Sequence, residues 1–271
     1  MGRAQRTKRN RKQSSRAGSR AVSAARGSAG GGRGATYAGI AVIVVLAVVV
    51  AVGVLLTRSH NTEAAIPPAR VSATYPSGLQ DGVVVAGKPG APTTVDAYED
   101  FLCPVCDLFE SQHSQNIQQA LNAGRIIVRY HMLNLLETRS NPPGYSLQAA
   151  NAGLCAAKAG VFPGYHTSLY GKQPEEGAAG YTVDQLVALG RALGAQGDFE
   201  QCVRSGAYDT QVKSQLAAAE SNQVLLQQTA NGPSFGTPTV LVNGKVIPVL
   251  TQAGSTQFNQ LINSAGTPKV P

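Results

Sequence analysis

The chain has 271 residues, with 23 Lys and Arg, 15 Asp and Glu, and a formal net charge of +8. Ten of the basic residues and none of the acidic ones lie in residues 1–36, so the rest of the chain is close to neutral. A basic tail joined to a nearly neutral domain excludes the ordinary basic nucleic-acid-binding domain, and the length suffices for one membrane segment and one domain with its own core.

Two segments precede the predicted domain. Residues 1–36 are rich in Arg, Ser and Gly and are expected to form a disordered cytoplasmic tail. Residues 37–56 are an uncharged, mostly aliphatic run. As a helix, this run is long enough to cross a hydrocarbon core of roughly 30 Å, where its side chains would contact membrane lipid. The positive flank before this run predicts a single-pass anchor in the cell membrane, with the N-terminus cytoplasmic and the domain extracytoplasmic. A cleavable signal peptide is the alternative, but its apolar region would usually be shorter, about 7–15 residues.

Residues 57–80 contain three prolines and are expected to be a linker that leads to a domain over residues 81–271. In this domain, short β-branched runs alternate with longer helical patterns, which indicates an α/β fold. The expected strands are 82–86, 94–98 and 125–133, followed by an Asn-Gly hairpin of 239–242 with 245–249. The expected helices are 104–122, 146–159, 198–204, 209–230 and 257–265, and a further helix that a capping box opens at Thr182.

The run Cys103-Pro104-Val105-Cys106 lies at the predicted junction of a strand and a helix. If Cys103 caps the helix, Pro104 takes the first helical position, where proline is favoured, and the sulfur is expected to be exposed at the helix tip, facing the positive end of the helix dipole. That position stabilises a thiolate, which is the nucleophile of disulfide exchange, while Cys106 lies one turn further in and is expected to be buried and to resolve the mixed disulfide. A fixed disulfide or half of a zinc site is the alternative, although no second cysteine pair or histidine pair at metal spacing completes a zinc site, so no metal is expected.

A second motif lies far downstream, where Thr237 and Pro238 precede an apolar run that ends in Asn-Gly. A proline before a strand is often only a turn residue, but cis bonds occur essentially before proline and usually serve a purpose. Together with the Cys-Pro-x-Cys run, the sequence Gly236-Thr237-Pro238-Thr239 resembles the DsbA family of thioredoxin-fold thiol–disulfide oxidoreductases.

The resemblance implies a thioredoxin fold with a helical insertion over about 144–232 and a peptide groove beside the cysteines. It also implies attack chemistry at Cys103, resolution by Cys106, and a cis peptide at Thr237–Pro238, with Thr237 touching the sulfurs. The substrates would be reduced exported proteins, a membrane quinone reductase of the VKOR or DsbB kind would reoxidise the enzyme, and no dissociable cofactor is needed.

The chain departs from the family pattern in two places. Many relatives carry a buried acid six residues before the first cysteine; here Ala97 occupies that position, and strand alternation turns Asp96 to the opposite face. Val105 replaces the histidine of the strongest oxidants and cannot donate a hydrogen bond to Cys103. Three acidic residues lie close to Cys103 in the sequence, and their negative charges would destabilise its thiolate: Glu99, Asp100 and Asp107. The protein is therefore expected to be a milder oxidant than the strongest members of the family.

Cys155 and Cys202 lie on predicted helices of the insertion and are expected to form a structural disulfide in an oxidising compartment. The alternatives are a second redox pair or two free buried thiols. His113 is expected to pack against the core, whereas His131 ends a strand and His166 lies in an expected Pro-Gly-Tyr loop, without partners at metal spacing.

The sequence therefore predicts a membrane-anchored disulfide donor. A reductase or isomerase is the nearest rival, and a non-catalytic module that holds copper or a client peptide is the rival from another class.

Overall fold

The computed structural model describes residues 65–229, 232–264 and 266. The predicted tail 1–36, the predicted membrane segment 37–56 and the first part of the predicted linker lie outside these residues. Within the described part of the chain, no helix combines the length and the apolar character that a membrane crossing needs.

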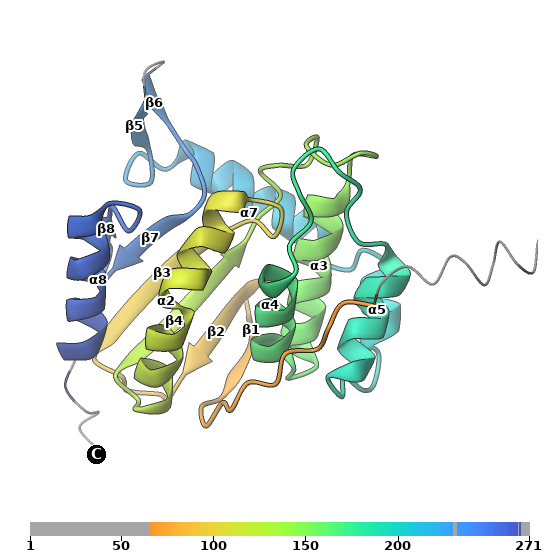
Figure 1. Ribbon diagram of the computed structural model, residues 1–271, viewed down its shortest axis with the longest axis horizontal. Helices are drawn as coiled ribbons and strands as arrows, with labels where there is room; N and C mark the ends of the chain where they lie inside the picture. The colour runs from red at the N-terminus through yellow and green to blue at the C-terminus, as the bar shows by residue number, and fades with distance from the viewer. Residues whose placement is uncertain (1–64, 230–231, 265, 267–271) are drawn as a thin grey trace, which may run out of the picture. The chain divides into compact units, whose positions relative to one another are not determined.

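A six-stranded sheet forms the centre of the fold, with the strand order β1-β2-β4-β3-β7-β8 (Figure 1). In this sheet β3 and β4 are parallel, and the other neighbouring pairs are antiparallel. Val95, Ala97 and Glu99 are buried on one face of β3, because successive side chains of a strand alternate between faces. The strands are β1 Ser77–Gln80, β2 Val83–Gly87, β3 Thr93–Glu99, β4 Ile126–Met132, β7 Thr239–Val242 and β8 Lys245–Ile247.

Helices cover both faces of the sheet. Helices α2 (Pro104–Asn122) and α8 (Gln252–Ser264) lie side by side, with the rings of Phe109 and Phe258 5.8 Å apart. Helix α7 (Asp209–Ser221) lies behind the sheet in Figure 1, where its side chains join a separate apolar cluster with Tyr98 and Leu241. The sheet is thus buried on both sides, as a central parallel pair requires.

The segment between β4 and β7 contains the expected helical insertion. A disulfide joins Cys155 on α3 to Cys202 on α6 and fixes two of its helices to each other. A short hairpin of β5 and β6 follows α7. The elements of the insertion are α3 Tyr145–Lys158, α4 Phe162–Gly171, α5 Val183–Ala192, α6 Phe199–Arg204, β5 Gln227–Thr229 and β6 Gly232–Ser234.

The thioredoxin-type order of strand, helix, strand, hairpin and helix is confirmed, and α2 has the predicted bounds. The capping box at the start of α5 is also present, with the Thr182 hydroxyl accepting from the Gln185 backbone. These elements depend on signals that lie within a few residues of one another, which is why the sequence located them.

Three boundaries differ by more than two residues from the predictions. Strand β1 lies inside the expected linker, because Asp81 and Gly82 adopt positive φ angles of 49° and 79° and turn the chain back onto β2. An Asp-Gly pair between apolar runs is a hairpin signal, so the sequence did contain this information. Helix α7 ends at Ser221 rather than continuing to 230, and α8 begins at Gln252, earlier than expected.

The largest difference is helix α4, which lies where the Pro-Gly-Tyr run predicts a loop. Pro163 lies in its first turn, where proline needs no hydrogen-bond partner and is tolerated. Gly164 faces the Ala69 carbonyl, and an added Cβ would lie 2.9 Å from that oxygen. The Pro-Gly pair therefore reflects a helix start packed closely against the segment before β1, and it brings His166 into the core.

Candidate active site

The first cysteine of the motif is held at the N-terminus of α2. Cys103 is the N-cap residue, with φ −75° and ψ 114°, and Pro104 follows at the start of the helix. The Cys103 carbonyl accepts from the backbone N–H groups of Cys106 and Asp107, at 3.0 and 3.2 Å. Its side chain therefore lies at the end of the helix where backbone N–H groups are unpaired and the dipole is positive.

The loop before the cysteine is anchored by Asp100, which is fully buried. Its carboxyl accepts from the backbone N–H of Leu102 and of Leu136, both at 2.8 Å, and from the Ser146 hydroxyl. These bonds join the loop to the chain after β4 and to helix α3. Asp100 was expected to oppose the Cys103 thiolate, but its oxygens are directed to these donors and hold the loop in place.

A second support comes from the insertion. The Gln173 side chain, just after α4, donates to the carbonyls of Phe101 and Cys103, both at 3.0 Å. The sequence did not predict this contact, because Gln173 lies 70 residues from Cys103 and no local pattern around it indicates a role at the active site.

The predicted cis peptide is present at Thr237–Pro238. The antiparallel pairing of β3 with β7 places Thr239 opposite Tyr98, so the chain just before β7 lies beside the active-site loop. The Cys103 thiol donates to the Thr237 carbonyl at 3.3 Å, and among the described residues the buried Thr237 hydroxyl has no hydrogen-bond partner.

These surroundings shift the pKa values of the two thiols in opposite directions. A hydrogen bond from the Cys106 thiol lowers the pKa of Cys103 to about 6, against an opposing effect of burial, and the backbone N–H groups of Val105 and Cys106 add to the lowering. Burial raises the pKa of Cys106 well above its ordinary value. At neutral pH the pair therefore holds one thiolate, on Cys103, and one thiol.

Access to the sulfur is narrower than the sequence suggested. Cys103 was expected to be exposed at a helix tip, but its side chain is only 5% exposed, while Cys106 is fully buried as predicted. The contact of Thr237 with the sulfur, which the resemblance implied, is present, and it places Cys103 under the Thr237–Pro238 segment. Val105 and Leu108, at 38% and 47% exposed, form an apolar surface on the first turns of α2.

A hollow beside the cis peptide is the candidate for the implied peptide groove. It has a volume of about 380 Å³ and is lined by Pro238, Val246, Leu250 and Leu226 among others. Leu250 is 48% exposed, so the hollow offers apolar contact to a ligand from solvent.

The acidic residues near the motif divide between the two faces of the sheet. Ala97 is buried, and Asp96 lies on the other face, where it pairs with Arg129 at 2.9 Å and His131 at 3.1 Å. Glu99, two residues after Ala97, is fully buried on the cysteine side. Burial raises the pKa of Glu99 to about 8, with a smaller raising effect from the charge of Cys103, so at neutral pH Glu99 is mostly uncharged. It therefore destabilises the thiolate less than an ionised carboxylate would.

Comparison with known proteins gives the family. The thioredoxin family model matches residues 80–263, more than half of the chain. The chain belongs to the thioredoxin family. Two solved structures from Mycobacterium tuberculosis, each with a TM-score of 0.54, are similar to it. The reduced disulfide bond oxidoreductase DsbG is 27% identical, covering 72% of this chain and 89% of that one. Oxidised DsbA is 28% identical, covering 70% and 97%.

Within this family the chain is a thiol–disulfide oxidoreductase of the DsbA type. MdbA, a thiol–disulfide oxidoreductase from Corynebacterium diphtheriae, shares the fold with a TM-score of 0.58 at 21% identity, covering 76% of this chain and all of that one. The serine/threonine-protein kinase PknE of Mycobacterium tuberculosis is 32% identical over 163 residues, which are 58% of this chain. This chain spans only 28% of that kinase.

Proposed function

We propose that this DsbA-type oxidoreductase is an extracytoplasmic disulfide donor that oxidises paired thiols of exported proteins. The observation that carries the proposal is the position of Cys103 at the N-terminus of α2, beside the cis Thr237–Pro238 peptide, where the pKa of its thiol is lowered to about 6. A stabilised thiolate favours the reduced enzyme over its disulfide, so the Cys103–Cys106 disulfide is easily given away.

The transfer takes two steps. A substrate thiolate attacks Sγ of Cys103 in the oxidised enzyme, which forms a mixed disulfide and releases Cys106, whose raised pKa favours its protonation. A second substrate thiolate then attacks the substrate sulfur of the mixed disulfide and expels Cys103 as a thiolate. Two electrons pass from the substrate to the enzyme, and the substrate leaves with a disulfide. In the reverse, reducing direction Cys106 resolves the mixed disulfide.

Substrate positioning is assigned to the cis peptide and its hollow. An extended peptide beside Thr237 and Pro238 would bring a cysteine to the covered Cys103 sulfur, and its apolar side chains would contact the hollow lined by Leu250. Since Cys103 is 5% exposed, we expect binding of the peptide to displace the Thr237 carbonyl from the sulfur.

The membrane setting is proposed from the sequence. An anchor over residues 37–56, with the basic tail inside, would hold the domain outside the membrane. A membrane quinone reductase of the VKOR or DsbB kind would return the pair to the disulfide, and no dissociable cofactor is required.

Refolding of reduced, unfolded ribonuclease tests the donor function. Oxidised protein should speed recovery of ribonuclease activity, and Cys103→Ser should abolish this gain. The matched control is the double variant Cys155→Ala/Cys202→Ala, which also removes a cysteine pair but should keep the activity while it is folded. Equal rates for the parent and Cys103→Ser would refute the proposal.

Two further measurements separate the rivals. The equilibrium of the Cys103–Cys106 pair with glutathione distinguishes a donor from a reductase, and repair of scrambled ribonuclease detects an isomerase. A protein that binds copper or peptide but shows no turnover in either assay would be the binding module. Labelling of intact cells with a membrane-impermeant thiol reagent, after reduction, tests whether the domain lies outside.

A further inference from the structure

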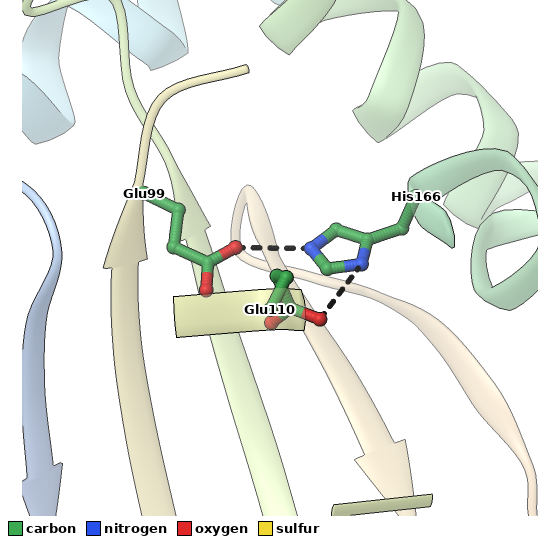
Figure 2. Close-up of side chains that lie close together, drawn as sticks. All are labelled: Glu99, Glu110 and His166. Atoms are coloured by element: carbon green, nitrogen blue, oxygen red, sulfur yellow. Dashed lines mark hydrogen bonds and ion pairs between the residues drawn. The ribbon is translucent and has the colours of Figure 1, made fainter. Parts of the chain in front are cut away.

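Three buried ionisable side chains meet beneath the active site and have no part in the exchange steps. Figure 2 shows the imidazole of His166 facing the carboxyl groups of Glu99 and Glu110, with one ring nitrogen directed to each. His166 Nε2 lies 3.0 Å from Glu99 Oε2, and His166 Nδ1 lies 4.0 Å from Glu110 Oε2. One ligand atom from each residue can be chosen so that all lie within 4.8 Å of one another.

The cluster lacks the hydrogen-bond donors and cationic side chains that buried carboxyl groups normally have. Glu99 is 0% exposed, Glu110 6% and His166 4%. Across the described residues, His166 is the side chain that forms ion pairs with the two carboxyls, and no Lys or Arg does so. One oxygen of each carboxyl, Oε1, is buried without any hydrogen-bond partner in the described part of the chain. Unsatisfied buried carboxyl oxygens are costly and call for an explanation.

A route from solvent reaches two of these side chains, Glu110 and His166. A cavity of about 220 Å³ between α2, α4 and the segment before β1 is lined by Glu110 and His166, together with Tyr75, Tyr130 and Arg70. It is large enough to hold several waters, so a small hydrated ion can approach the cluster without unfolding of the domain.

We propose that Glu99, Glu110 and His166 form a binding site for a divalent transition-metal ion, with Zn²⁺ as its expected occupant. One imidazole nitrogen and one oxygen of each carboxyl would supply three ligands, and a water from the cavity the fourth. Two carboxylates neutralise the ion, and the oxygens that now lack donors gain a partner. The mixed nitrogen and oxygen set favours Zn²⁺ over Mg²⁺ or Ca²⁺, which prefer oxygen ligands alone.

The geometry requires only a local adjustment. Ligand atoms about 2.1 Å from a tetrahedral ion are about 3.4 Å from one another. The observed separations, up to 4.8 Å, allow this after rotation of the carboxyl groups. The three ligands come from the end of β3, from α2 and from α4, so a bound ion would tie the inserted helix to the strand and helix that carry the cysteines. The site does not depend on the proposed donor function.

Calorimetric titration with ZnCl₂ tests the site in the full chain, freed of metal by a chelator. The protein is used with Cys103 and Cys106 oxidised, so that thiolates cannot bind zinc, and near pH 8, because the ligands must be deprotonated. One equivalent should bind and raise the melting temperature. His166→Gln and Glu110→Gln should each weaken binding by about 100-fold or more, beyond the usual loss for an outer-shell partner.

His131→Gln is the matched control, since His131 is also buried and paired with an acid, Asp96, yet lies on the other face. It should leave zinc affinity unchanged. The parent protein with Co²⁺ gives a readout that needs no variant: intense tetrahedral d–d absorption without a thiolate charge-transfer band. Absence of one bound equivalent in the oxidised parent, binding unaffected by both ligand variants, or a thiolate band with Co²⁺ would overturn the proposal.

Discussion

The stability of the reduced protein should depend on pH through Cys103. Its pKa falls from an ordinary value of 9.0 to about 6 in the folded state, while the disulfide of the oxidised protein does not titrate. A group with a lowered folded pKa contributes stability above its unfolded pKa and loses it as the pH falls through the folded pKa. The contribution should therefore be complete above about pH 9 and absent below about pH 5.

The size of the effect follows from the two pKa values. It is about 4 kcal/mol when complete, about 2.7 kcal/mol near pH 8 and about 1.4 kcal/mol near pH 7. The reduced protein should therefore gain about 2.7 kcal/mol relative to the oxidised protein between about pH 5 and pH 8. Groups that titrate in both forms cancel to first order in this difference.

Urea unfolding of both forms across this pH range measures the difference, and the ultraviolet absorbance of the thiolate gives the pKa of Cys103 directly. Cys106→Ser and Cys106→Ala form a matched pair, because serine keeps a hydrogen-bond donor and alanine removes it. The pKa of Cys103 should rise more in the alanine variant. A flat difference between the two redox forms, or a thiolate midpoint near the ordinary value of 9.0 in the parent, would refute the reasoning.

Three other changes test the supports of the site. Cys155→Ala/Cys202→Ala opens a loop with a sequence separation of 47 and should cost about 4 kcal/mol in urea unfolding; a loss below about 1 kcal/mol would contradict a stabilising role. Gln173→Ala leaves two loop carbonyls without their donor and should lower the free energy of unfolding by about 1–3 kcal/mol. It should also shift the pH midpoint of Cys103 alkylation. An unchanged midpoint would limit the residue to a purely structural role. Gly254→Ala places a Cβ 2.0 Å from the Pro248 carbonyl and should lower the free energy of unfolding by about 1–3 kcal/mol or more. Gly171→Ala is the control, since its Cβ meets open space, and it should cost less than about 1 kcal/mol. Equal melting temperatures of the two variants would contradict this prediction.

The sequence located those elements whose signals are local. Pro104 after Cys103 fixed the start of α2, the capping box fixed the start of α5, and Asn-Gly fixed the hairpin of β7 and β8. Predictions were wrong where the same local signal is compatible with two local structures. A Pro-Gly pair opens α4 rather than a loop, because its environment supplies the close packing that the pair permits.

Short-range signals determined the cysteine motif and its helix, because capping, turns and strand alternation depend on neighbouring residues. The family followed from the resemblance of two short motifs, Cys103–Cys106 and Gly236–Thr239, to the DsbA pattern. The resemblance placed Thr237 beside the sulfurs, but the tertiary structure alone decided that this segment buries Cys103. It alone also decided how Gln173 holds the loop and how Glu99 meets Glu110 and His166. These contacts join residues from separate elements, and only the packing of the insertion against the sheet sets their distances and the low polarity that shifts their pKa values.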